Sequence, residues 1–292
     1  MDRIRYKGKE LLPVKRDIVF KALFAGDSDL ELLASLLASI LDINIHANNL
    51  VVTNTELPPV HETGKLSRVD IRVKTEDGKH INVEIQLRNE YNMDRRSIFY
   101  LSKLYTDQMM AKMTFDELCP AIAINILDFI YLPFEEYHNR YRMKNTRNNH
   151  ELTDVFEVNF IELPKAPKAG EGLKDLWMLF LSTDNEEVLD MLTSESPVFK
   201  KAISKLVYVS SDEKLRYELD MREKAELDYQ SAMKTNYRKG KEEGKIEGKM
   251  EGKMEGKEET VAHALKEGMK PEDIVRYIGV SLEKVIEIKS KL

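Results

Sequence analysis

The pattern of apolar and polar positions predicts alternating helices and strands along the first 130 residues of the chain. Apolar residues that recur every three or four positions indicate a helix with a buried face, whereas strict alternation or a short apolar run indicates a strand. The expected helices span residues 17–41, with a break near Gly26, and 93–113; the expected strands span residues 50–52, 69–74, 81–87 and 121–127. This order, helix, three strands, helix, strand, predicts an α/β fold.

Residues 68–87 predict a β-hairpin whose register depends on the length of its turn. A two-residue loop would set the apolar face of one strand against the polar face of the other, which is unfavourable. A three-residue loop at residues 76–78, with Gly78 in the left-handed conformation, instead pairs apolar residues such as Ile71 and Val83. We therefore expect the three-residue loop.

The same register would set Asp70 opposite Glu84 on one face of the sheet. Opposed Cβ atoms in a sheet lie about 4.5–5.5 Å apart. Two carboxylates at that distance repel each other unless a cation lies between them, and hard oxygen ligands suit Mg²⁺ or Mn²⁺. The alternative is that both are ordinary solvated residues, because outward-facing polar residues are the default for an antiparallel sheet.

Gln86 follows Glu84 by two positions, so its amide emerges on the same face of the strand. The series Asp70, Glu84, Gln86 resembles the motif of the PD-(D/E)XK nuclease superfamily. It is most similar to the Rpn group of recombination-promoting nucleases, which are also described as transposase-like. In that superfamily the last lysine of the motif is sometimes replaced by glutamine, and Gln86 resembles that variant.

The resemblance extends to both sides of the hairpin. Upstream, Asp17, Phe20 and Lys21 match an Asp-x-x-Phe-Lys run that opens the family. Downstream, residues 93–109 resemble the helix after the last catalytic strand, with Arg96, Tyr100 and Gln108 on matching positions. The resemblance implies an αβββαβ restriction-endonuclease-like core with a mixed sheet, followed by a helical region and a helical C-terminal tail.

Phosphodiester hydrolysis would assign distinct roles to these residues. Asp70 and Glu84 would be metal ligands, with the Ile85 carbonyl as a third, and Mg²⁺ or Mn²⁺ would be the cofactor. Gln86 would orient the attacking water or contact the phosphate, although glutamine supplies neither a positive charge nor a base. By resemblance Asp17 would be an added catalytic carboxylate; the alternative is a first-turn helix anion.

Four residues are candidates for binding the substrate. Arg96 and Tyr100 lie four positions apart, so they share a helix face. If that face looks onto the site, Arg96 could clamp a phosphate; otherwise the pair simply packs against the sheet. Arg72 and Lys21 would contribute to a local basic surface for DNA.

Composition limits the possible classes of protein. The formal net charge of −6 gives no global attraction to nucleic acid, so DNA would need a local basic surface. The one cysteine, Cys119, precludes an internal disulfide and fits a reducing compartment. The chain lacks a segment of 18 apolar residues and an apolar signal sequence, so a cytoplasmic protein without a membrane partner is expected.

The expected organisation has four parts. They are a nuclease-like core over residues 1–165, a helical extension over 166–236, a four-residue repeat over 237–259, and a small module over 260–292. Residues 155–163 predict a further strand that extends the sheet at an edge or pairs with a neighbour. Helices are expected at 173–181, 186–192, 198–207 and 212–238. We expect these helices to cover one face of the sheet.

Glycine recurs every four residues at Gly240, Gly244, Gly248, Gly252 and Gly256. On a helix the repeat would form four rows: glycine, lysine, a mostly apolar row and glutamate. Each glycine destabilises a helix by about 1 kcal/mol relative to alanine, so an isolated helix would be marginal. Two alternatives follow: a frayed tether, or a helix that pairs with another copy so that its lysine row faces the partner's glutamate row.

The last 33 residues predict three short helical pieces, with a stop at Gly268, a start at Pro271, a second stop at Gly279 and an N-cap at Ser281. The segment resembles a miniature helix-turn-helix; a helical cap or dimer clasp is the alternative.

For the whole chain, the leading hypothesis is a Mg²⁺-dependent DNA endonuclease of the recombination-promoting type. The alternative is a catalytically weak or inactive nuclease fold that binds DNA or protein and oligomerises.

Overall fold

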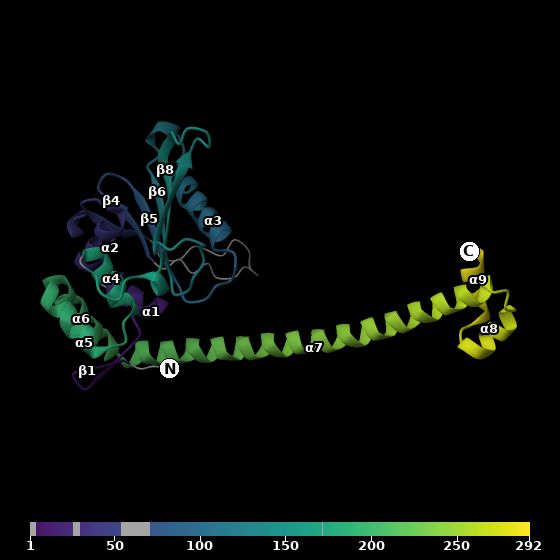
Figure 1. Ribbon diagram of the computed structural model, residues 1–292. Helices are drawn as coiled ribbons and strands as arrows, with labels where there is room; N and C mark the ends of the chain where they lie inside the picture. The colour runs from purple at the N-terminus through teal and green to yellow at the C-terminus, as the bar shows by residue number, and fades with distance from the viewer. Residues whose placement is uncertain (1–3, 26–29, 54–70, 171) are drawn as a thin grey trace. The chain divides into compact units, whose positions relative to one another are not determined.

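The computed structural model describes residues 4–25, 30–53, 71–170 and 172–292 (Figure 1). The chain divides into two compact units, Met1–Leu219 and Asp220–Leu292. The first contains the sheet and its covering helices, and the second contains most of one long helix and two short ones. Among the described helices, none is long and apolar enough to cross a membrane.

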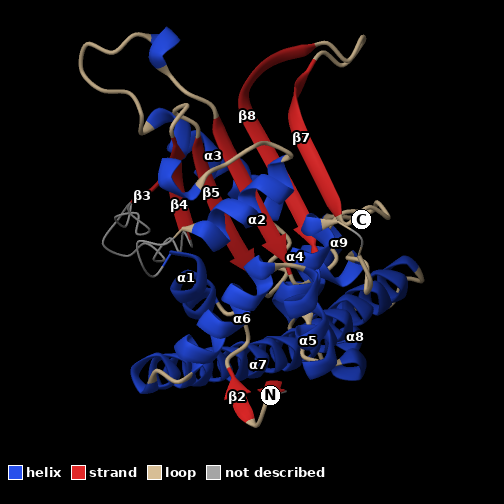
Figure 2. Cartoon of the chain, turned by 90° about the vertical axis from the view of Figure 1, so that its left-hand side faces the viewer, coloured by secondary structure: helices blue, strands red, loops and turns tan. Residues whose placement is uncertain are grey.

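A mixed six-stranded sheet organises the first unit, with the strand order β3-β4-β5-β6-β8-β7 (Figure 2). The strands are β3 (Leu50–Thr53), β4 (Ile71–Thr75), β5 (His80–Gln86), β6 (Ala121–Leu127), β7 (His138–Lys144) and β8 (Glu151–Glu162). β5, β6 and β8 run parallel, whereas the outer pairs are antiparallel. Parallel neighbours need a crossover, which α3 (Met93–Thr106) supplies between β5 and β6. The expected order helix, three strands, helix, strand is confirmed.

The β4–β5 hairpin has the register that its hydrophobic pattern required. Ile71 pairs with Val83, and the Thr75 amide donates to the Lys79 carbonyl at 3.0 Å, which closes a three-residue loop. Gly78 has φ = 86°, the left-handed conformation expected at this place. Asp70, the residue expected opposite Glu84, lies outside the described residues.

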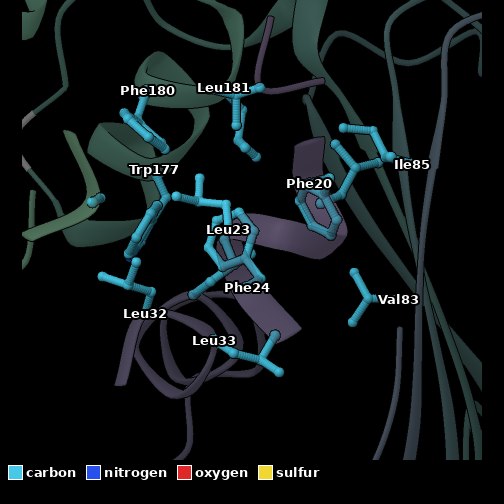
Figure 3. Packing of buried hydrophobic residues seen from close by; sticks show 14 of the residues in the cluster. Phe20, Leu23, Phe24, Leu32, Leu33, Val83, Ile85, Trp177, Phe180 and Leu181 are labelled. Atoms are coloured by element: carbon cyan, nitrogen blue, oxygen red, sulfur yellow. The ribbon is translucent and has the colours of Figure 1, made fainter. Parts of the chain in front are cut away.

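One face of the sheet is covered by helices from both ends of the first unit. These are α1 (Asp17–Ala25), α2 (Glu31–Leu41), α4 (Leu173–Ser182), α5 (Glu186–Glu195) and α6 (Pro197–Ser210). Fully buried Trp177 lies among them, with its ring 5.6 Å from that of Phe24 and 4.8 Å from that of Phe199 (Figure 3). Its indole N–H donates to Ser35 Oγ at 3.1 Å, which satisfies the buried donor. The expected helical cover is confirmed for the helices at 173–181, 186–192 and 198–207, whereas of the segment 212–238 only Leu215 and Leu219 join this core.

The opposite face is covered by α3 (Figure 1). Met93, Leu101 and Leu104 of this helix pack against a small cluster that includes Ala121 and Ala123 of β6. Small side chains on the central strand leave room for the helix axis to approach the sheet. α3 ends at Thr106, earlier than the expected Met113, because the chain turns at residues 107–112.

Two structural features were not expected from the sequence. A short hairpin, β1 (Ile4–Tyr6) and β2 (Lys9–Leu11), precedes the first helix. β7, in a segment for which no strand was predicted from the sequence, forms the sheet edge, so β8 is an internal strand. Most residues of β7 are exposed, and Arg142 ties this strand to the buried Glu157 carboxylate of β8 at 2.6 Å.

The second unit contains most of α7 (Glu213–Lys266), with α8 (Pro271–Ile278) and α9 (Leu282–Ser290). α7 is helical throughout the glycine repeat, and whether it pairs with another copy stays a proposal. The expected stops at Gly268 and Gly279 are confirmed by φ values of 81° and 67°. Ser281 accepts from the Lys284 amide at 3.3 Å, which confirms the N-cap. Four residues form the small core: Val261, Ile274, Val285 and Ile288.

We expect Gly78→Ala to destabilise the first unit, because an alanine Cβ would strain the left-handed turn and lie 2.5 Å from Cys119 Sγ. Gly8→Ala is the matched control, since Gly8 also has a positive φ of 77° but open space around its Cβ. Urea unfolding should show a loss of about 1–3 kcal/mol for Gly78→Ala. Equal losses in the two variants would contradict the proposed contact with Cys119.

Candidate active site

Glu84 lies in the middle of β5 with a side chain only 2% exposed. Its strand alternates Val83 and Ile85 toward the helical core with Asn82, Glu84 and Gln86 toward α3. Burial raises the pKa of the Glu84 carboxyl above its ordinary value, and the nearby charge and hydrogen bond of Arg96 only partly oppose this effect. A buried carboxylate in a sheet centre is costly, which marks Glu84 as a candidate functional residue.

Two adjacent strands hold two consecutive residues of α3. Arg96 donates through Nη2 to Glu84 Oε1 and forms an ion pair with it. Asn125, the β6 residue directly beside Glu84, accepts from Ser97 Oγ at 2.9 Å. Asn125 Nδ2 also donates to the Asn159 carbonyl at 3.1 Å, so the amide is anchored on both sides. Together these contacts fix the position of α3 relative to the candidate carboxylate.

The helix face that carries Arg96 and Tyr100 looks onto Glu84. The Arg96 guanidinium lies 5.6 Å from the centre of the Tyr100 ring, a cation–π contact. Glu90, in the loop after β5, lies 4.0 Å from Arg96 Nη1. Arg96 therefore bridges two carboxylates and an aromatic ring at the rim of the site.

Arg72 and Asn82 are opposed residues of β4 and β5 on the same sheet face as Glu84. Arg72 Nε and Asn82 Oδ1 are both buried, and neither has a hydrogen-bond partner within the described ranges. Arg72 Nη1 lies 3.7 Å from Asp107, and burial lowers the pKa of its guanidinium despite that charge. The free donor and the free acceptor can therefore hydrogen-bond a ligand or a water molecule beside Glu84.

A second charged group lies where β5 and β6 end. The Gln86 carbonyl accepts from the Asp128 amide at 2.9 Å, and the Asp128 carboxylate pairs with Lys15 Nζ at 2.7 Å. Asp17 begins α1, where its Oδ1 accepts from the Ile18 amide at 2.9 Å. Lys21 is half-buried on the same helix.

α1 packs on the Val83 and Ile85 face of the sheet, opposite to the face that carries Glu84 (Figure 3). Asp17 and Lys21 thus belong to a different layer from Arg72, Arg96 and Tyr100.

The side chains on this face have oxygen donors that suit a hard divalent cation. They offer the Glu84 carboxylate, whose Oε1 accepts from Arg96, and the Asn82 Oδ1, which lacks a partner within the described ranges. No group of three or more His, Cys, Asp or Glu residues close enough to hold a metal occurs among the residues that the structure describes. The second expected carboxylate, Asp70, is outside them.

Comparison with known families shows which family the chain belongs to. Residues 14–236 match the PD-(D/E)XK nuclease family transposases. The match covers more than half of the 292 residues, so the chain belongs to this family, and its mixed sheet is an α/β restriction-endonuclease-like fold. Membership indicates a nuclease-like function, with DNA as substrate and a divalent metal ion as the usual cofactor of the family. No curated protein and no solved structure matches the chain.

Sequence reasoning missed four residues that surround the predicted ones: Asn82, Ser97, Asn125 and Asp128. A signal for one of them was available, because Asn125 interrupts the otherwise apolar strand segment at residues 121–127. A polar residue in a buried strand usually has a specific partner. Only the packing of α3 reveals that Ser97 is the partner of Asn125.

We expect Arg96→Met to raise the pKa of the Glu84 carboxyl further, because the charge and hydrogen bond that favour the ionised form are removed. Carbon-detected NMR titration of the glutamate carboxyl groups in the full-length protein measures this shift. Arg95→Met is the control, since Arg95 is an exposed neighbour on the same helix. A Glu84 pKa that stays unchanged or falls in Arg96→Met would contradict the assignment.

Proposed function

We propose that the protein is a metal-dependent DNA endonuclease of the recombination-promoting type. The observation that carries the proposal is the buried Glu84 carboxylate, held through one oxygen by Arg96, on the strand that the family resemblance marks as catalytic. A nuclease needs an oriented carboxylate with an oxygen left over for a cation. The ion pair supplies the orientation.

In this proposal Asp70 and Glu84 hold Mg²⁺ or Mn²⁺, with the Ile85 carbonyl as a third ligand. The hairpin register seen from Ile71 onward supports the Asp70 assignment, which otherwise rests on the sequence alone. When bound, the ion would supply an activated water and neutralise charge on the phosphate. Gln86 would orient the water, since its side chain emerges beside Glu84.

Arg96, Tyr100 and Arg72 are proposed to contact the DNA backbone near the site, because all three lie on the Glu84 face. Arg96 has donors beyond the one used by Glu84, so it can bind a phosphate and a carboxylate together. Asp17 and Lys21 are assigned on resemblance, as a further catalytic carboxylate and a basic contact. Their helix lies on the opposite face, so any role would be at the strand ends.

We expect Glu84→Gln to reduce plasmid nicking in Mg²⁺ or Mn²⁺ by at least about 100-fold, because a neutral amide holds a divalent ion weakly. Glu90→Gln is the matched control: it makes the same charge change on an exposed carboxylate that also faces Arg96. Nicking is measured on supercoiled DNA with metal and with EDTA. Circular dichroism shows whether each variant is folded.

Two outcomes would count against the proposal. Nicking that persists in an Asp70→Ala, Glu84→Ala double variant would indicate a contaminating enzyme. A wild-type protein without metal-dependent nicking over a range of salt concentrations would favour the alternative, a nuclease fold that only binds.

We also propose that the repeat in α7 pairs two copies of the chain. Ile246, Met250 and Met254 form an exposed apolar row, between 57% and 65% exposed. A Cβ on any repeat glycine would meet nothing within 4 Å, so the glycine row is open to a partner. The lysine row and the glutamate row lie on either side of the apolar row and of the glycine row. The lysines of one copy can therefore face the glutamates of its partner. The helix would then be stabilised by its mate.

Light scattering should give about twice the chain mass of 33.9 kDa for the full-length protein. We expect a triple variant, Lys245→Glu, Lys249→Glu and Lys253→Glu, to shift the mass toward one chain, because two acidic rows then face each other. The same three lysines changed to arginine keep the charge and should keep the mass. A monomeric wild type, or a number of chains per particle that is unchanged when the chain ends at Asn236, would remove the pairing proposal.

The domain boundaries at residues 165, 236 and 259 and a cytoplasmic location remain proposals. The free thiol of Cys119 supports a reducing compartment.

A further inference from the structure

α3 carries a second row of side chains next to the row that faces Glu84. The row consists of Arg95, Phe99 and Lys103, spaced by four residues, and Tyr91 precedes it by the same interval in the loop after β5. Residues four apart share a side of a helix. Arg95, Phe99 and Lys103 therefore lie on one side of α3, and Tyr91 lies in the loop just before the helix.

The two aromatic side chains are highly exposed: Tyr91 is 85% exposed and Phe99 is 56% exposed. The Phe99 ring lies 5.4 Å from that of Tyr100 in an edge-to-face arrangement, so it is supported by the inner row. Large aromatic rings exposed beside a candidate active site are characteristic of a binding surface.

Tyr91 is held in an unusual backbone conformation. Its φ of 58° is left-handed, which is uncommon for a bulky residue, and its amide donates to Asn89 Oδ1 at 2.8 Å. Strain of this kind concentrates at functional sites. The preceding residue, Glu90, lies 4.0 Å from Arg96, so the loop that presents Tyr91 is tied to the site.

Arg95, between the two rings in sequence, and Lys103, one turn after Phe99, supply positive charge. Within the described part of the chain neither forms an ion pair, although the whole chain has a net charge of −6. Cations that alternate with aromatic rings suit single-stranded nucleic acid, whose phosphates bind the cations while its bases stack on the rings. Bases inside a duplex are already stacked on each other and cannot offer a face to either ring.

We propose that Tyr91, Arg95, Phe99 and Lys103 bind a single-stranded segment of DNA and lead it to the Glu84 site. This inference rests on the proposed nuclease function and specifies its substrate class: DNA with unpaired bases beside the cut. Tyr91 and Phe99 stack on bases, whereas Arg95 and Lys103 neutralise phosphates. Recognition is independent of sequence, because every base has a face that can stack.

Binding is tested with full-length protein in EDTA, where cleavage is absent, using a single-stranded oligonucleotide that contains 2-aminopurine and a matched duplex. Tyr91→Ala and Phe99→Ala should each weaken single-strand binding by roughly 5- to 100-fold, while duplex binding changes less than twofold. Tyr91→Trp should restore binding and the quenching of 2-aminopurine. Tyr208→Ala, which removes a 77% exposed tyrosine from α6, is the matched control and should bind as the wild type does.

Arg95→Ala should reduce the salt dependence of single-strand binding without abolishing the quenching, since it removes a phosphate contact and leaves the stacking rings. Single-strand binding by Tyr91→Ala and Phe99→Ala equal to that of Tyr208→Ala would overturn the proposal, as would an equal loss for duplex. A change in mass by light scattering without a change in DNA binding would also overturn it, and would assign the row to contact between copies.

The test separates this inference from the nuclease proposal. If the wild type nicks DNA but the two aromatic variants bind single strands normally, only the single-strand surface is refuted. If the wild type fails to nick but those variants still lose single-strand binding, the surface stands and the catalytic proposal fails.

Discussion

The buried ion pair between Glu84 and Arg96 is the contact on which the candidate site depends. A carboxylate with 2% exposure would be strongly disfavoured in a sheet centre without a partner, and removing one member of such a pair leaves an uncompensated charge. The pair therefore requires α3 to lie across β5 in one position. Ser97 and Asn125 enforce the same position one residue further along the helix and one strand further across the sheet. Site geometry and helix packing are thus determined by one set of contacts.

The two faces of the sheet have different tasks. The face that carries Val83 and Ile85 is apolar and buried, because the helices α1, α2, α4, α5 and α6 pack over it around Trp177. The other face is covered by α3 and retains polar side chains: Arg72, Asn82, Glu84 and Asn125. Helices far along the sequence thus stabilise β5 from one side, while its other side carries the candidate site. Alternate side chains of this seven-residue strand therefore serve either the core or the site.

The long helix α7 forms although the intrinsic helix propensity of its repeat is low. Its repeat contains a glycine in every fourth position, and each lowers helix stability relative to alanine. The helix is nonetheless continuous, with its charged rows and its apolar row all exposed. In the pairing proposed above, packing of the apolar row would offset the effect of the glycines.

The sequence by itself determined the hairpin register, the αβββαβ order and the caps of the last helices, because these depend on alternation, turn length and glycine conformation, all local properties. It also singled out Glu84 and Arg96. It did not determine that the two residues contact each other, that Ser97 is the partner of Asn125, or that β7 forms an edge from exposed polar residues. Those outcomes depend on which face α3 covers and on ion pairs between residues distant in sequence, and such contacts exist only when the chain has folded.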